Sequence, residues 1–144
     1  MEAIVNHVGQ VVADLARSRR FYEEALGFVY WREIRPPDDM VARLNDLPAP
    51  LGVTAVYLRL GGFVLELIAY ADASVHEHAG CRVMNDLGLT RLSVSVDDVD
   101  AAAARVVEHG GTVLEATHVG AVVLVRDPDG QLVELVGTPS GASR

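Results

Sequence analysis

The chain has 144 residues, of which 50% are hydrophobic and 22% charged, and its formal net charge is −8. This composition is typical of a soluble globular protein and excludes disordered and fibrous proteins. All twelve basic residues are arginine, so we expect no nucleic-acid partner, because polyanions are bound by strongly basic surfaces. No apolar run is long enough to cross a membrane, and the first residues lack a signal-peptide pattern. We therefore expect a cytoplasmic protein with no membrane partner.

An internal repeat organises the chain. Residues 6–15 align without a gap with residues 90–99, at an offset of 84 residues. Each copy predicts a valine-rich strand, followed by a helix that begins after Asp14 in the first copy and after Asp97 or Asp98 in the second. Aspartate is a favoured N-cap residue, and glycines near the expected ends of both helices suit a left-handed C-cap.

Further strands follow each helix. In the first copy the apolar runs predict strands over residues 28–35, 53–60 and 63–70. In the second copy they predict strands over residues 112–117, 121–126 and 131–137. Tight turns at residues 61–62 and 127–130 join neighbouring strands. In the first copy, an insertion over residues 36–52 separates the strand over 28–35 from the strand over 53–60. We interpret it as an irregular loop that shapes a pocket.

These elements predict an α+β fold in one domain. Two βαβββ modules, at about 1–72 and 88–138, are joined by a linker over residues 73–87. Neither module would bury much apolar surface alone, so we expect their curved sheets to pair around a common cleft.

Four ionisable residues stand on otherwise apolar strands. His7 and Arg91 occupy equivalent positions in the first strand of each copy, and Glu66 and Glu134 lie in the last strands. Because strand side chains alternate between faces, we expect all four to point into the cleft. Buried carboxylates are costly unless they are paired or bind a ligand, so this repeated arrangement predicts a functional site.

Several motifs together resemble a known family. They are Asn6-His7-Val8, Asp14-Leu15-Ala16-Arg17-Ser18, Phe21-Tyr22, Leu26-Gly27-Phe28, Leu65-Glu66-Leu67, Val96-Asp97-Asp98-Val99-Asp100 and the run from Arg126 to Leu135. The chain resembles the vicinal oxygen chelate superfamily, which includes glyoxalase I, bleomycin resistance proteins, extradiol dioxygenases and methylmalonyl-CoA epimerase. The resemblance implies the glyoxalase-like fold and a homodimer. It also implies a divalent metal held by four residues, which fall on His7, Glu66, position 91 and Glu134.

Position 91 departs from the family pattern. Arginine stays protonated in proteins, so Arg91 cannot be a metal ligand. A unit charge at about 4 Å is worth about 4 kcal/mol at an effective dielectric of 20, so Arg91 would also repel a cation. Two arrangements remain: His7, Glu66 and Glu134 hold one divalent metal while Arg91 turns aside, or the Arg91 guanidinium replaces the metal. We favour the second, with no cofactor.

Other residues have simpler interpretations. His76 and His78 form a His-x-His motif, but a polar linker is a better setting for them than a second metal site. Phe21, Tyr22, Tyr30 and Trp31 are predicted to be core or interface aromatics rather than a substrate cage. His109 and His118 are predicted to lie on the surface.

Three functions fit this sequence. The first is an isomerase or lyase, such as an epimerase, cyclase or glyoxalase-like enzyme, that moves a proton next to a carbonyl of a small molecule. In it Glu66 or Glu134 is the base, His7 relays the proton, and Arg91 or a metal stabilises the enolate or anchors a carboxylate. The second is a metal-free resistance protein that binds an antibiotic or another small molecule. The third makes the four residues a structural ion-pair cluster.

Overall fold

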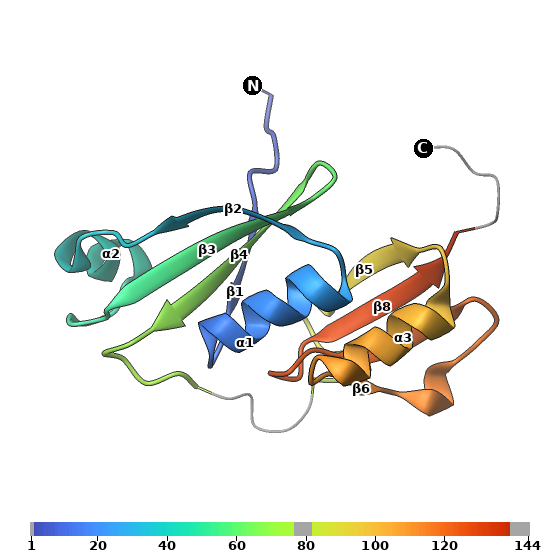
Figure 1. The fold of residues 1–144 in the computed structure, drawn as a ribbon. Helices are drawn as coiled ribbons and strands as arrows, with labels where there is room; N and C mark the ends of the chain where they lie inside the picture. The colour runs from blue at the N-terminus through green and yellow to red at the C-terminus, as the bar shows by residue number, and fades with distance from the viewer. Residues whose placement is uncertain (1, 77–81, 139–144) are drawn as a thin grey trace. The chain divides into compact units, whose positions relative to one another are not determined.

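The computed structural model describes residues 2–76 and 82–138, and Figure 1 shows its fold. The described chain divides into two compact units. The first contains the residues up to Arg19 together with residues 27–76, and the second contains residues 20–26 and 82–138. Each unit is built on one four-stranded sheet. The predicted α+β fold with two βαβββ modules is therefore confirmed.

The sheet of the first unit has the strand order β1-β4-β3-β2. Its strands are β1 (Val8–Val11), β2 (Val29–Ile34), β3 (Val53–Leu60) and β4 (Phe63–Tyr70). β1 runs parallel to β4, and the other neighbours are antiparallel. The two-residue turn at Gly61 and Gly62 joins β3 to β4, with Leu60 opposite Phe63. The predicted strands over 53–60 and 63–70 are confirmed at both ends.

The first helix begins and ends where the sequence predicts. α1 (Leu15–Arg20) starts after Asp14, whose Oδ1 accepts a hydrogen bond from the Arg17 amide at 2.9 Å. Gly27, with φ of 77°, provides the left-handed residue at its end. After Arg20 the helix continues as the π-helical segment η1 (Phe21–Ala25), so its second half is not a regular α-helix. η1 belongs to the second unit, so this helix contributes to both units.

The insertion between β2 and β3 contains a helix, which corrects the prediction of an irregular loop. α2 (Asp38–Asn45) carries Asp38 and Asp39 in its first turn, where carboxylates favour the helix dipole. Its buried residues form a small apolar cluster with one end of the sheet: Val41, Ala42, Leu51, Val53, Ile68 and Tyr70. The Asn45 amide also donates to the Tyr70 hydroxyl at 3.0 Å. α2 therefore covers one end of the sheet face that carries Ile68.

The sheet of the second unit has the equivalent order β5-β8-β7-β6. Its strands are β5 (Arg91–Val96), β6 (Thr112–Val113), β7 (Val122–Arg126) and β8 (Leu132–Gly137). β5 runs parallel to β8. α3 (Val99–Glu108) begins after Asp98, whose Oδ1 accepts from the Ala101 amide at 2.9 Å. Of the two predicted caps, the structure thus selects Asp98.

The predicted strand over residues 112–117 is shorter in the structure. β6 stops at Val113, and a 3-10 turn, η2 (Glu115–Thr117), follows. The Thr117 hydroxyl donates to the Leu114 carbonyl at 2.7 Å and accepts from the Leu124 amide at 2.9 Å. These side-chain bonds replace ladder bonds and end the strand, because threonine hydroxyls compete with backbone partners.

The buried core of the second unit includes the aromatics of η1. Phe21 and Tyr22 are fully buried, as the sequence predicted. The Tyr22 hydroxyl donates to the buried Asp127 at 2.9 Å. Gly111 leaves no room for a side chain, since a Cβ there would lie 2.8 Å from the Phe21 ring. Among the described residues, no helix is both long and apolar enough to cross a bilayer.

Candidate functional site

His7 and Glu66 are in direct contact in the first unit. Glu66 lies in β4 opposite Gly9 of β1, and His7 lies two residues before Gly9. The His7 Nε2 and Glu66 Oε2 atoms are 3.1 Å apart, and the Glu66 side chain is only 14% exposed. A Cβ at Gly9 would stand 3.4 Å from that carboxylate oxygen. The glycine therefore leaves space beside the carboxylate.

Tyr57 completes this cluster, and the sequence analysis missed it. Its hydroxyl donates a hydrogen bond to Glu66 Oε1 at 2.6 Å. Its ring also contacts the His7 ring edge to face, with centroids 5.5 Å apart. The sequence held a signal for this residue, because the predicted turn at residues 61–62 fixes the β3–β4 register and places Tyr57 opposite Glu66. We call His7, Tyr57 and Glu66 the Glu66 cluster.

The pKa of Tyr57 is raised from 10.0 to about 12. Burial is the largest cause, and the hydrogen bond to Glu66 and the negative charge of Glu66 add to it, while the charge of Arg32 and its hydrogen bond to Tyr57 lower the pKa. The folded protein therefore keeps the Tyr57 proton at a pH where the unfolded chain releases it. Stability is expected to fall as pH rises from about 10 to about 12. Urea unfolding at several pH values in this window measures the slope, and Tyr57→Phe should make it shallower. An identical slope in Tyr57→Phe would contradict this assignment.

Arg91 and Glu134 form the corresponding pair in the second unit. Arg91 Nε lies 3.1 Å from Glu134 Oε1, and the side chains are 35% and 19% exposed. The Ser93 hydroxyl donates to Glu134 Oε2 at 2.8 Å, because Ser93 is opposite Glu134 in the β5–β8 register. Both carboxylate oxygens of Glu134 are thus engaged. The structure brings together His7 with Glu66 and Arg91 with Glu134, one pair in each unit.

The sequence matches one family model over residues 4–135, that of the glyoxalase/bleomycin resistance protein/dioxygenase superfamily. The chain belongs to this superfamily. The resemblance drawn from the sequence motifs is thereby confirmed. Among curated proteins, none matches the sequence significantly.

Solved structures of the superfamily share the fold. A glyoxalase family protein from Bacillus cereus superposes with a TM-score of 0.77 at 21% identity, covering 92% of each chain. The trypanothione-dependent glyoxalase I of Leishmania major superposes with a TM-score of 0.67 at 27% identity, covering 91% of this chain and 84% of that one. The fosfomycin resistance protein FosX of Listeria monocytogenes has a TM-score of 0.60 at 14% identity, covering 96% and 94%.

The residues at positions 7, 66, 91 and 134 do not fit the four-ligand metal site that the family resemblance implies. Arg91 cannot donate an electron pair to a metal, and its guanidinium already binds Glu134. Within residues 2–76 and 82–138, no group of three or more His, Cys, Asp or Glu side chains is placed to hold a metal ion. His78 of the His-x-His motif lies outside the described residues.

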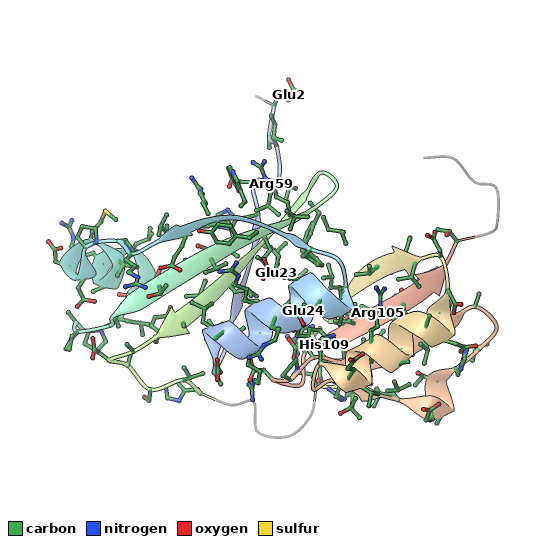
Figure 2. The ribbon with its side chains drawn as sticks, viewed as in Figure 1. Glu2, Glu23, Glu24, Arg59, Arg105 and His109 are labelled. Atoms are coloured by element: carbon green, nitrogen blue, oxygen red, sulfur yellow. The ribbon has the colours of Figure 1, made fainter. Side chains whose placement is uncertain are left out.

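Two other histidines were predicted to lie on the surface. His118 is exposed, but the side chain of His109 is only 19% exposed and its Nδ1 lies 3.3 Å from Glu24 Oε2. Figure 2 shows His109 and Glu24 near Arg105, where η1 packs against α3. His109 is therefore partly covered by helix packing rather than fully exposed.

A hollow in the second unit lies at the N-terminal end of α3. Its lining includes Asp97, Asp98, Asp100 and His118 but neither Arg91 nor Glu134. This acidic lining disfavours an anionic ligand. The hollow is thus separate from the residues that the sequence singles out.

Proposed function

We propose that the chain is an isomerase- or lyase-type enzyme that moves a proton next to a carbonyl of a small molecule, using protein groups alone. The observation that carries this proposal is the Glu66 carboxylate, held on one oxygen by Tyr57 and on the other by His7. A carboxylate fixed in this way is suited to general-base catalysis, because its orientation is set before the substrate arrives.

The contacts favour Glu66 over Glu134 as the base. Glu134 is bound by a guanidinium that cannot release its proton, so this carboxylate is already neutralised. Glu66 instead contacts the imidazole of His7, a side chain that can relay a proton. We therefore assign proton abstraction to Glu66 and proton relay to His7. Tyr57 keeps the carboxylate oriented, and Arg91 anchors an anionic group or stabilises an enolate.

One of the structural neighbours supports this reaction class. The Leishmania major protein is a glyoxalase I, and the proposed reaction class includes glyoxalase-like enzymes. The identity of 27% makes it a relative of moderate distance.

We also propose a cytoplasmic homodimer, as the family resemblance implies, and light scattering of the purified protein measures the assembly.

Deuterium incorporation tests the proposal. Chelator-treated protein is incubated in heavy water with a panel of small 2-oxo acids, 2-hydroxy ketones and thioesters, and proton NMR follows the hydrogens next to the carbonyl. We expect one class of compound to lose that signal, or to be converted, faster than in buffer with heat-denatured protein. If a compound binds tightly and neither exchanges nor reacts, the enzyme proposal is wrong.

That outcome would favour the second candidate function, a metal-free small-molecule-binding protein. The observation in its favour is the half-exposed Trp31, which lies beside Tyr57 with ring centroids 6.1 Å apart. An exposed aromatic ring gives a planar ligand a surface to stack on. FosX, another neighbour, is a fosfomycin resistance protein, so resistance functions occur on this fold.

A further inference from the structure

A row of cross-strand neighbours extends the Glu66 cluster to the edge of its sheet. In the register of the first unit, Arg32 of β2 is opposite Tyr57, Tyr57 is opposite Glu66, and Glu66 is opposite Gly9. Directly opposite residues point to the same face and lie about 5 Å apart. Arg32 therefore lies next to Tyr57 on the face that carries the proposed base.

A bulge in β2 brings Trp31 to the same place. The pairing with β3 shifts between Tyr30 and Arg32, so Trp31 is the extra residue. Bulges commonly re-aim a side chain beside a functional site. The exposed Trp31 ring packs edge to face on Tyr57.

Two guanidinium groups stack on these rings. The Arg59 guanidinium carbon lies 3.5 Å from the centroid of the Trp31 ring, and that of Arg32 lies 4.5 Å from the centroids of both Trp31 and Tyr57. Arg59 is labelled in Figure 2. Cation–π contacts of this kind hold a guanidinium in place while leaving its N–H donors available.

Neither of these arginines forms an ion pair with a carboxylate in the described part of the chain. Arg35, only three residues after Arg32, binds Glu33 at 2.9 Å, and Arg91 binds Glu134. In a chain of net charge −8, two stacked guanidiniums without carboxylate partners form a local positive site. Such a site attracts an anion, and the rings beside it favour a flat one.

We propose that Arg32, Trp31 and Arg59 form a subsite for a planar organic acid, with the carboxylate on the guanidiniums and the flat part of the molecule against the Trp31 ring. This deepens the proposed function and rests on it for the claim that the bound acid is the substrate. Because Arg32 neighbours Tyr57, a molecule held here by its carboxylate reaches toward Glu66. The substrate class is then a conjugated or aromatic carboxylic acid that carries a reactive carbonyl.

The chain contains a single tryptophan, so its fluorescence reports on this subsite directly. Benzoate is titrated against the whole protein, with benzamide as the neutral probe of the same shape, and calorimetry supplies an independent dissociation constant. We expect benzoate to quench Trp31 and to bind at least tenfold more tightly than benzamide. Added salt should weaken the binding of benzoate more than that of benzamide.

Substitutions identify the residues involved. Arg32→Gln and Arg59→Gln are each expected to weaken benzoate binding by about tenfold to a hundredfold, the usual effect of losing a charge-assisted contact. Arg43→Gln removes the same charge from an exposed position of α2 in the same unit and should leave binding unchanged. Equal binding of benzoate and benzamide, or equal effects of all three substitutions, would overturn the subsite.

The two proposals fail separately. If benzoate binds as expected and no compound in the panel exchanges deuterium, the subsite stands and the proposed reaction is wrong. If a substrate turns over and neither arginine substitution alters benzoate binding or the KM of that substrate, the subsite is wrong and the reaction stands.

Discussion

Replacing Glu66 with glutamine is expected to lower kcat for the substrate found in the deuterium panel by about 10²- to 10⁴-fold, the usual contribution of a general base. Glutamine has nearly the same shape and keeps an oxygen that can accept the 2.6 Å hydrogen bond from Tyr57. The side chain loses its negative charge and its ability to take a proton, and an NH2 group replaces one oxygen. KM should therefore change much less than kcat.

Glu134→Gln is the matched control, because it makes the same chemical change in the equivalent strand. Its carboxylate is already bound by Arg91 and Ser93, so we expect a smaller loss of kcat. Thermal unfolding of both variants shows whether the fold survives. Full activity in Glu66→Gln would exclude Glu66 as the base, and an equal loss in both variants would remove the preference for Glu66. Wild-type activity in both, with lower stability, would instead indicate a structural ion-pair role, because each substitution removes one partner of its pair and leaves the other behind.

Asp127→Ala is expected to destabilise the protein by about 3 kcal/mol or more. Asp127 is only 3% exposed, and it accepts hydrogen bonds from the Tyr22 hydroxyl and from the amides of Asp129 and Gln131, at 2.8–2.9 Å. Alanine leaves these donors without their acceptor inside the protein. Urea unfolding of wild type and variant measures the difference.

Tyr22→Phe separates the helix contact from the turn contacts. It removes only one of the donors and should cost about 1–2 kcal/mol. The Tyr22→Phe and Asp127→Ala double variant should lose less than the sum of the two single losses, because the residues share one hydrogen bond. Strict additivity would contradict the Tyr22–Asp127 hydrogen bond that ties η1 into the second unit.

Much of the fold could be predicted from the sequence because its signals are local. Alternating valines, aspartate caps and glycine turns each fix a few neighbouring residues, and the strands at 53–60 and 63–70 were predicted at both ends. The errors occurred where tertiary contacts decide. α2 forms because Val41 and Ala42 pack on the sheet, and β6 stops early because Thr117 bonds the backbone around it.

The candidate site was predicted in part. His7, Glu66, Arg91 and Glu134 stood out because charged residues on apolar strands are costly to bury. Tyr57 did not stand out, since an aromatic residue in a strand is ordinary until the register places it opposite Glu66. The contact of Trp31 with Tyr57 could not be predicted for a similar reason, because it depends on the bulge in β2. The convergence of all four residues in one cleft stays a prediction.

Metal content tests most directly whether protein groups replace the metal of the superfamily. Elemental analysis is made on protein purified without chelator, for wild type and for Arg91→His, which places a side chain able to bind a metal at position 91. Because Arg91 binds Glu134 at 3.1 Å, we expect far less than one divalent ion per wild-type chain and a clear gain in Arg91→His. One tightly bound divalent ion per wild-type chain, with activity lost on its removal, would contradict chemistry by protein groups alone.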